Sequence, residues 1–166
     1  MEGIFFGRGG NLVVKAFKLL RKNYSSNVKL VVAGPKSWPL REKMPEGIIF
    51  LGDSSWKTLK KYYLMADVFC MPSYFEGFEI VFAESLSHGV PCIGRNIQAM
   101  PEIITPGVNG YLLKIENEEE LTMLLVKVLE DDEMKNRVEK MSTSYKDYYS
   151  WDRVAADMMK VLKTRR

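Results

Sequence analysis

The sequence predicts an α/β fold in which helices cover both faces of a parallel sheet. Short apolar runs alternate with longer amphipathic segments along the whole chain, and glycine or proline ends most of the short runs. This alternation is typical of βαβ units, in which each strand is followed by a crossover helix. Right-handed crossovers wind such units into a doubly wound sheet. We therefore expect a Rossmann-like layer structure.

The apolar spacing predicts the individual elements. Strands are expected at residues 3–7, 28–33, 47–51, 68–71, 91–94 and 110–113, and helices at residues 11–23, 55–66, 80–88, 118–130, 132–149 and 151–163. Asn11 and either Ser54 or Ser55 are expected to cap the first two helices. Gly89 should end the third.

Length and composition indicate one globular domain. The chain has 166 residues, of which 46% are hydrophobic and 27% charged, with a net charge of +3. This apolar content is sufficient for a core. The small net charge argues against a nucleic-acid partner. Lysines and arginines cluster on expected helix surfaces, so a weak peripheral contact with an anionic membrane surface stays open.

The same sequence features bear on location and cofactors. No apolar run approaches the roughly 20 residues of a membrane span, and the first residues lack a signal peptide. Cys70 and Cys92 lie inside apolar runs, as buried cysteines of a reducing compartment do. We expect a cytoplasmic protein, with the inner face of the membrane as an alternative. One histidine and two cysteines have no metal-ligand spacing, so no metal is expected.

The candidate ligand contacts are the residues that follow the strands. In doubly wound sheets, ligands bind in the crevice beyond the carboxyl ends of the strands. The residues expected there are Gly7, Arg8, Gly34, Gly52, Asp53, the segment 72–79 and the segment 94–100.

Residues 72–85 carry the strongest signal for an anion site. An irregular turn with Gly77 separates a strand from a helix that begins near Ile80. The backbone N–H groups from Gly77 to Val81 would be unpaired at this helix start, and such groups bind phosphates.

Two carboxylates flank this anion site. Glu84 lies one turn into the helix, where it could accept hydrogen bonds from a ribose diol. Glu76 lies before the helix, where it could hold sugar hydroxyls or face positive charge that develops at an anomeric carbon. The two carboxylates therefore lie on opposite sides of the expected phosphate site.

Residues 76–85, E-G-F-x-I-x-x-x-E-S, resemble the E-x7-E motif of retaining glycosyltransferases with the GT-B fold, in particular group 1 (family 4). Further motifs of that family are similar in order and spacing along nearly the whole chain. They are G-R at 7–8, the strand ending in Gly34, the segment 49–52, A-D-V with P-S at 66–73, G-x-P at 89–91, P-E-I-I with G-x-x-G-x-L at 101–112, and the terminal helix from 149.

The resemblance implies that residues 1–166 are the C-terminal nucleotide-sugar-binding domain of a two-domain enzyme. The N-terminal acceptor-binding domain would be its partner, and residues 150–166 would form a terminal helix that crosses back to that domain. Such an enzyme transfers a hexose from a nucleotide-diphosphate sugar with retention of anomeric configuration. It uses no metal or other cofactor. The isolated domain would be inactive.

The resemblance also assigns residue roles. Glu76 and Arg8 would be catalytic, because Glu76 would contact the donor sugar and Arg8 would clamp the leaving diphosphate. Glu84 would bind the ribose. The other donor-binding candidates are Gly77, Phe78, Glu79, Ile80, Gly7, Gly34, Gly52, Asp53 and Ser73.

The chain departs from the family pattern at three places. Arg8 is followed by Gly9 and Gly10 rather than by a loop with lysine, so the second cationic residue of the clamp is not identified. Glu79 stands where glycine is common, and we expect it to select the donor sugar. Gln98 and Ala99 replace two frequent glycines.

Two other functions stay open. One is a non-catalytic nucleotide-sugar-binding module, which the shortened loop after Arg8 favours. The other is one half of a nucleotide-sugar epimerase. The choice between UDP and GDP, the sugar and the acceptor are also open.

Overall fold

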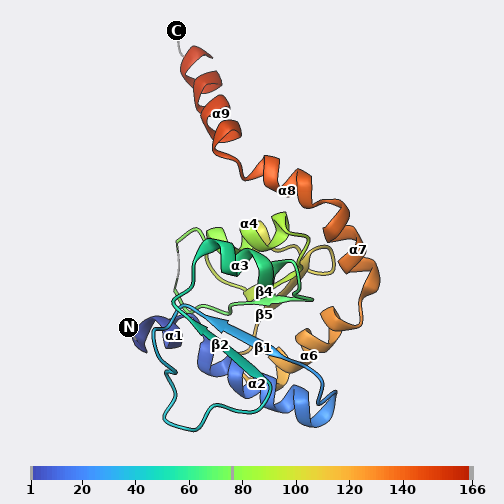
Figure 1. Ribbon diagram of the computed structural model, residues 1–166. Helices are drawn as coiled ribbons and strands as arrows, with labels where there is room; N and C mark the ends of the chain where they lie inside the picture. The colour runs from blue at the N-terminus through green and yellow to red at the C-terminus, as the bar shows by residue number, and fades with distance from the viewer. Residues whose placement is uncertain (1, 76, 165–166) are drawn as a thin grey trace.

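The computed structural model describes residues 2–75 and 77–164 (Figure 1). Strands β1 (Leu30–Ala33) and β2 (Ile48–Gly52) form a parallel pair. Strands β3 (Phe69–Cys70), β4 (Cys92–Arg95) and β5 (Gly110–Leu113) form a parallel sheet in the order β3-β4-β5. The helices are α1 (Glu2–Gly7), α2 (Gly10–Asn23), α3 (Trp56–Tyr63), α4 (Ile80–Ser87), α5 (Met100–Ile103), α6 (Glu118–Leu129), α7 (Asp132–Lys140), α8 (Ser142–Tyr148) and α9 (Trp151–Thr164). The predicted α/β class with parallel strands is confirmed.

The core is built around β4, which pairs with β3 on one side and β5 on the other. Helices α3 and α4 lie over one face of these strands, and α2 and α6 lie over the other (Figure 1). Cys92 and Ile93 of β4 are fully buried, as are Phe82 of α4 and Leu121 of α6. This layering places the carboxyl ends of the strands between two sets of helices.

The strand predicted at residues 3–7 is wrong, because these residues belong to α1. Phe5 is buried against α2, where a Cβ on Gly10 would lie 2.4 Å from its ring. An apolar run of three residues between glycines has no period that separates a strand from a helix. The packing of Phe5 against Gly10 therefore favours the helical conformation of residues 3–7.

This helix divides the sheet. In the doubly wound order, the first strand lies between the second and the fourth. With residues 3–7 in α1, no strand among the described residues joins β1 to β3. The single sheet that we expected is present as two hydrogen-bonded parts.

The helix boundaries agree with the predicted ones to within three residues, with two differences in capping and continuity. Ser55 caps α3 as predicted and accepts a hydrogen bond from the Thr58 N–H at 3.3 Å. Gly9 rather than Asn11 precedes α2, with a φ of 74°. The helix expected at 132–149 is divided at Met141 into α7 and α8. The short helix α5 was not predicted.

Helix α9 projects away from the layered body (Figure 1). It carries several exposed apolar side chains, among them Met158 and Leu162. Among the described residues, no helix combines the length and apolar character that crossing a membrane requires.

Candidate functional site

The carboxyl ends of β1 and β2 lie on the same side of the molecule as α1 (Figure 1). The Gly34 N–H, directly after β1, donates a hydrogen bond to the Gly52 carbonyl at 2.8 Å. Gly34 and Gly52 have φ values of 115° and 67°, which glycine adopts without strain. Asp53 follows and is exposed. These three predicted donor-binding residues therefore lie together at one end of the strands.

The turn that carries Arg8 packs against the segment before α4. The Tyr74 N–H donates to the Gly7 carbonyl at 2.9 Å. A Cβ on Gly9 would lie 2.5 Å from the Pro72 carbonyl oxygen. Arg8 lies between these two contacts and is exposed. Two segments that are far apart in the sequence, and that both supply predicted site residues, are thus in direct contact.

Glu76 lies outside the described residues. Beyond it, the exposed residues Gly77 and Phe78 lead to Glu79, of which only 3% is accessible. This burial shows that the Glu79 side chain does not point into solvent. Its role in choosing the donor sugar stays a prediction.

Helix α4 begins at Ile80, as predicted. The Ile80 N–H already donates to the Phe78 carbonyl at 3.0 Å. The expectation that every N–H from Gly77 to Val81 is unpaired is therefore wrong at Ile80. A phosphate at this helix start would depend on the remaining amides.

Ser73 lies three residues beyond the end of β3, in the segment where we predicted a donor contact. Its side chain is fully buried, and its Oγ has no hydrogen-bond partner among the described residues. In this conformation Ser73 offers no surface to a ligand.

Glu84 lies on the side of α4 that faces α3. A side-chain hydrogen bond joins it to Tyr63. The Tyr63 ring stacks on His88 at a centroid distance of 5.4 Å. The His88 Nδ1 lies 2.7 Å from the Glu84 carbonyl oxygen and donates to it. Burial raises the pKa of Glu84, while the electrostatic interaction with His88 and the Tyr63 hydrogen bond oppose this shift. The Glu84 carboxylate is therefore partly buried, and the hydrogen bond with Tyr63 fixes its orientation.

Glu84→Gln is expected to raise thermal stability at neutral pH. Burial raises the pKa of Glu84 in the folded state, so ionisation costs stability above this pKa. As the pH falls through the folded pKa of Glu84, the wild-type carboxyl becomes neutral and the difference in Tm should close. Glutamine can still accept the Tyr63 hydrogen bond. Calorimetric melting between neutral and acidic pH checks this, with the exposed Glu102→Gln as control. A Tm difference that does not change with pH would contradict it.

Three residues at or shortly beyond the carboxyl ends of β3, β4 and β5 form a cluster that the sequence did not predict. Arg95 ends β4, and its Nη1 donates to Glu116 at 3.1 Å. The Tyr74 hydroxyl also donates to Glu116. Arg95 lies within the segment 94–100 that was expected at the crevice, but no motif marked it.

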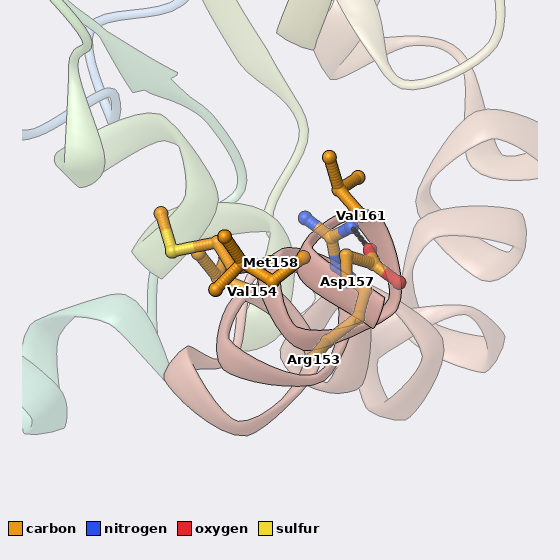
Figure 2. A pocket seen from close by; sticks show the side chains of 6 residues that line it. Arg153, Val154, Asp157, Met158 and Val161 are labelled. Carbon is orange, nitrogen blue, oxygen red and sulfur yellow. Dashed lines mark hydrogen bonds and ion pairs between the residues drawn. The ribbon is translucent and has the colours of Figure 1, made fainter. Parts of the chain in front are cut away.

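A groove on α9 is separate from this site. Figure 2 shows Arg153, Val154, Asp157, Met158 and Val161 along this helix, with an Arg153–Asp157 ion pair of 2.6 Å. Every residue that lines the groove belongs to α9, so the groove is an open surface of one helix. Among the described residues, no group of three or more His, Cys, Asp or Glu side chains could hold a metal ion.

The layered parallel fold, with its candidate contacts at the strand ends, is that of GT-B glycosyltransferase domains. The Anabaena protein HepE, solved in complex with UDP-glucose, aligns with 95% of this chain and 46% of its own length, with a TM-score of 0.76 and 15% identity. Sucrose-phosphate synthase from Thermosynechococcus elongatus aligns with 95% of this chain and 42% of its own, with a TM-score of 0.78 and 20% identity.

The chain belongs to the glycosyl transferases group 1 family, whose family model matches residues 5–144. It is 30% identical to an uncharacterized glycosyltransferase of Methanocaldococcus jannaschii, over 95% of this chain and 42% of that protein. It is 27% identical to the N-acetyl-alpha-D-glucosaminyl L-malate synthase of Bacillus anthracis, over 74% of this chain and 33% of that protein. The chain thus spans less than half the length of these relatives.

Proposed function

We propose that this chain is the donor-binding half of a retaining glycosyltransferase that transfers a hexose from a nucleotide-diphosphate sugar. The observation that carries the proposal is the contact between the Arg8 turn and the segment 72–74, directly before the E-x7-E motif. This contact brings a cation beside the loop that leads into α4. The complex of HepE with UDP-glucose supports a nucleotide sugar as the donor.

The proposed roles follow the order of groups along a donor. Glu84 binds the ribose, Arg8 stabilises the leaving diphosphate, and Glu76 contacts the transferred sugar. The amides at the start of α4, together with the strand-end residues Gly34, Gly52 and Asp53, complete the donor site. No metal or other cofactor takes part.

We also propose that residues 150–166 contact an N-terminal acceptor-binding domain. The length of the relatives leaves room for such a domain, since this chain covers 42% of the archaeal relative. Such a domain would bury the exposed apolar residues of α9, which include Trp151, Met158 and Leu162. The protein would act in the cytoplasm or at the inner face of the membrane, in polysaccharide or glycoconjugate biosynthesis, without a nucleic-acid partner.

A non-catalytic nucleotide-sugar-binding module is the second candidate. The short turn from Gly7 to Gly10 favours it, because no lysine follows Arg8 there. Such a module would bind the donor and leave it intact.

An assay of sugar transfer distinguishes the two. The chain joined to its acceptor domain is expected to consume one of a panel of UDP- and GDP-hexoses and to form a product with the anomeric configuration of the donor, which NMR detects. The 166-residue chain alone should bind the nucleoside diphosphate but transfer no sugar, because the reacting groups are held together by both domains. Robust transfer by the chain alone, or an inverted product, would contradict the proposal. Binding without any donor consumption would favour the module.

A further inference from the structure

Arg95 is held at the end of β4 by contacts on three sides. Its Nε and Nη2 both donate to the Pro72 carbonyl at 3.3 Å, and its Nη1 donates to Glu116 at 3.1 Å. Its guanidinium lies 4.2 Å from the centre of the Tyr74 ring. Only 12% of the Arg95 side chain is exposed, against 48% for Glu116.

The cluster is closed by Tyr74. Its hydroxyl donates to one oxygen of Glu116, whose other oxygen accepts from Arg95. The segments after β3, β4 and β5 are thereby tied to one another. A guanidinium is suited to this task, because its planar fork can bind two acceptors while an aromatic ring covers its face.

The cluster is connected to the turn that carries Arg8. The Tyr74 N–H donates to the Gly7 carbonyl at 2.9 Å. The Pro72 carbonyl, which accepts from Arg95, is also the atom against which Gly9 packs. Residues 72–74 therefore contact the backbone on both sides of Arg8.

We propose that Arg95 is a positioning residue of the donor site, which fixes residues 72–74 and through them the turn that holds Arg8 against the donor diphosphate. The proposal rests on the proposed function, since it requires that Arg8 contacts the diphosphate. Arg95 acts through its two-acceptor geometry, and its charge alone is not sufficient.

Arg95→Lys separates geometry from charge. Lysine keeps the positive charge and can still donate hydrogen bonds, so the variant should fold. Its ammonium is a compact point charge, however, and lacks the planar fork that binds Pro72 and Glu116 from fixed directions. A matched control is Arg137→Lys, because Arg137 also binds two acceptors, in its case the backbone carbonyls of Gly107 and Val108. Neither carbonyl belongs to the candidate donor site.

The test is calorimetric titration of the 166-residue chain with UDP and GDP, and with uridine and guanosine. In Arg95→Lys, affinity for the nucleoside diphosphate should fall by about twofold to a hundredfold, the range of coupling within one hydrogen-bond network, with little change for the nucleoside. Arg137→Lys should match the wild type. In the Arg8→Ala background, Arg95→Lys should add little further loss, because the group that it positions is gone.

Other results would overturn the inference. A full retention of diphosphate affinity in Arg95→Lys, combined with a loss in Arg95→Ala, would show that Arg95 acts by charge alone. Equal losses for nucleoside and nucleoside diphosphate would show a merely structural role, as would additive effects of Arg8→Ala and Arg95→Lys. If the wild-type chain binds neither UDP nor GDP, the proposed function fails, and this inference fails with it.

Discussion

Gly110→Ala is expected to lower the free energy of unfolding by about 3 kcal/mol or more, since overpacking beside a fully packed strand is strongly destabilising. A Cβ at this position would lie 1.8 Å from the Cys92 carbonyl oxygen. The two residues are paired in register across β4 and β5. Cys92 is fully buried, so β4 cannot move away without disturbing the core.

Urea unfolding of the chain measures this effect. Gly107→Ala is the matched control in the loop that precedes β5, because Gly107 has a φ of 76° and a Cβ added there would meet no atom within 4 Å. Its free energy of unfolding should fall by only roughly 1–2 kcal/mol, which is the cost of placing alanine in a left-handed conformation. Equal losses for the two variants would show that the approach to Cys92 does not matter.

Glu76→Ala is expected to give the largest loss of activity. In the chain joined to its acceptor domain, turnover with the sugar donor should fall about 10²- to 10³-fold, the effect of removing one group that stabilises transition-state charge. Donor binding should change less, because the contact strengthens as charge develops at the anomeric carbon. Steady-state kinetics with the preferred donor checks this. The exposed carboxylate variant Glu102→Ala should keep wild-type turnover, and an unchanged turnover in Glu76→Ala would refute the assigned role.

Local signals predicted most of the helices and the positions of several candidate site residues at strand ends. The serine at position 55 caps α3 because its side chain bonds within its own turn. The rule that ligands bind at the carboxyl ends of strands correctly placed Gly34 beside Gly52. These features depend on residues close in sequence or on the parallel direction of the strands.

Contacts between distant residues could not be predicted in the same way. Phe5 adopts a helix because it packs on Gly10, and the apolar run 4–6 alone does not reveal this. Arg95 binds a carboxylate 21 residues away, and Tyr74 binds the same one over 42 residues. A hydrogen bond joins Tyr63 of α3 to Glu84 of α4. The spacing of residues along the sequence does not identify such pairs. Their positions at strand ends or on helix faces indicate only that each residue could contact another element.

The most direct test of the central claim is calorimetric titration of UDP and GDP into the wild-type chain and into Glu84→Ala and Glu76→Ala. The account predicts that the wild type binds one of the two nucleotides. Glu84→Ala should lose about 1–3 kcal/mol of this binding, because the ribose would lose hydrogen bonds to a charged group. Glu76→Ala should bind nearly as the wild type does, because a plain nucleoside diphosphate has no transferred sugar. Equal losses in both variants, a loss only in Glu76→Ala, or no binding of either nucleotide by the wild type would contradict the account.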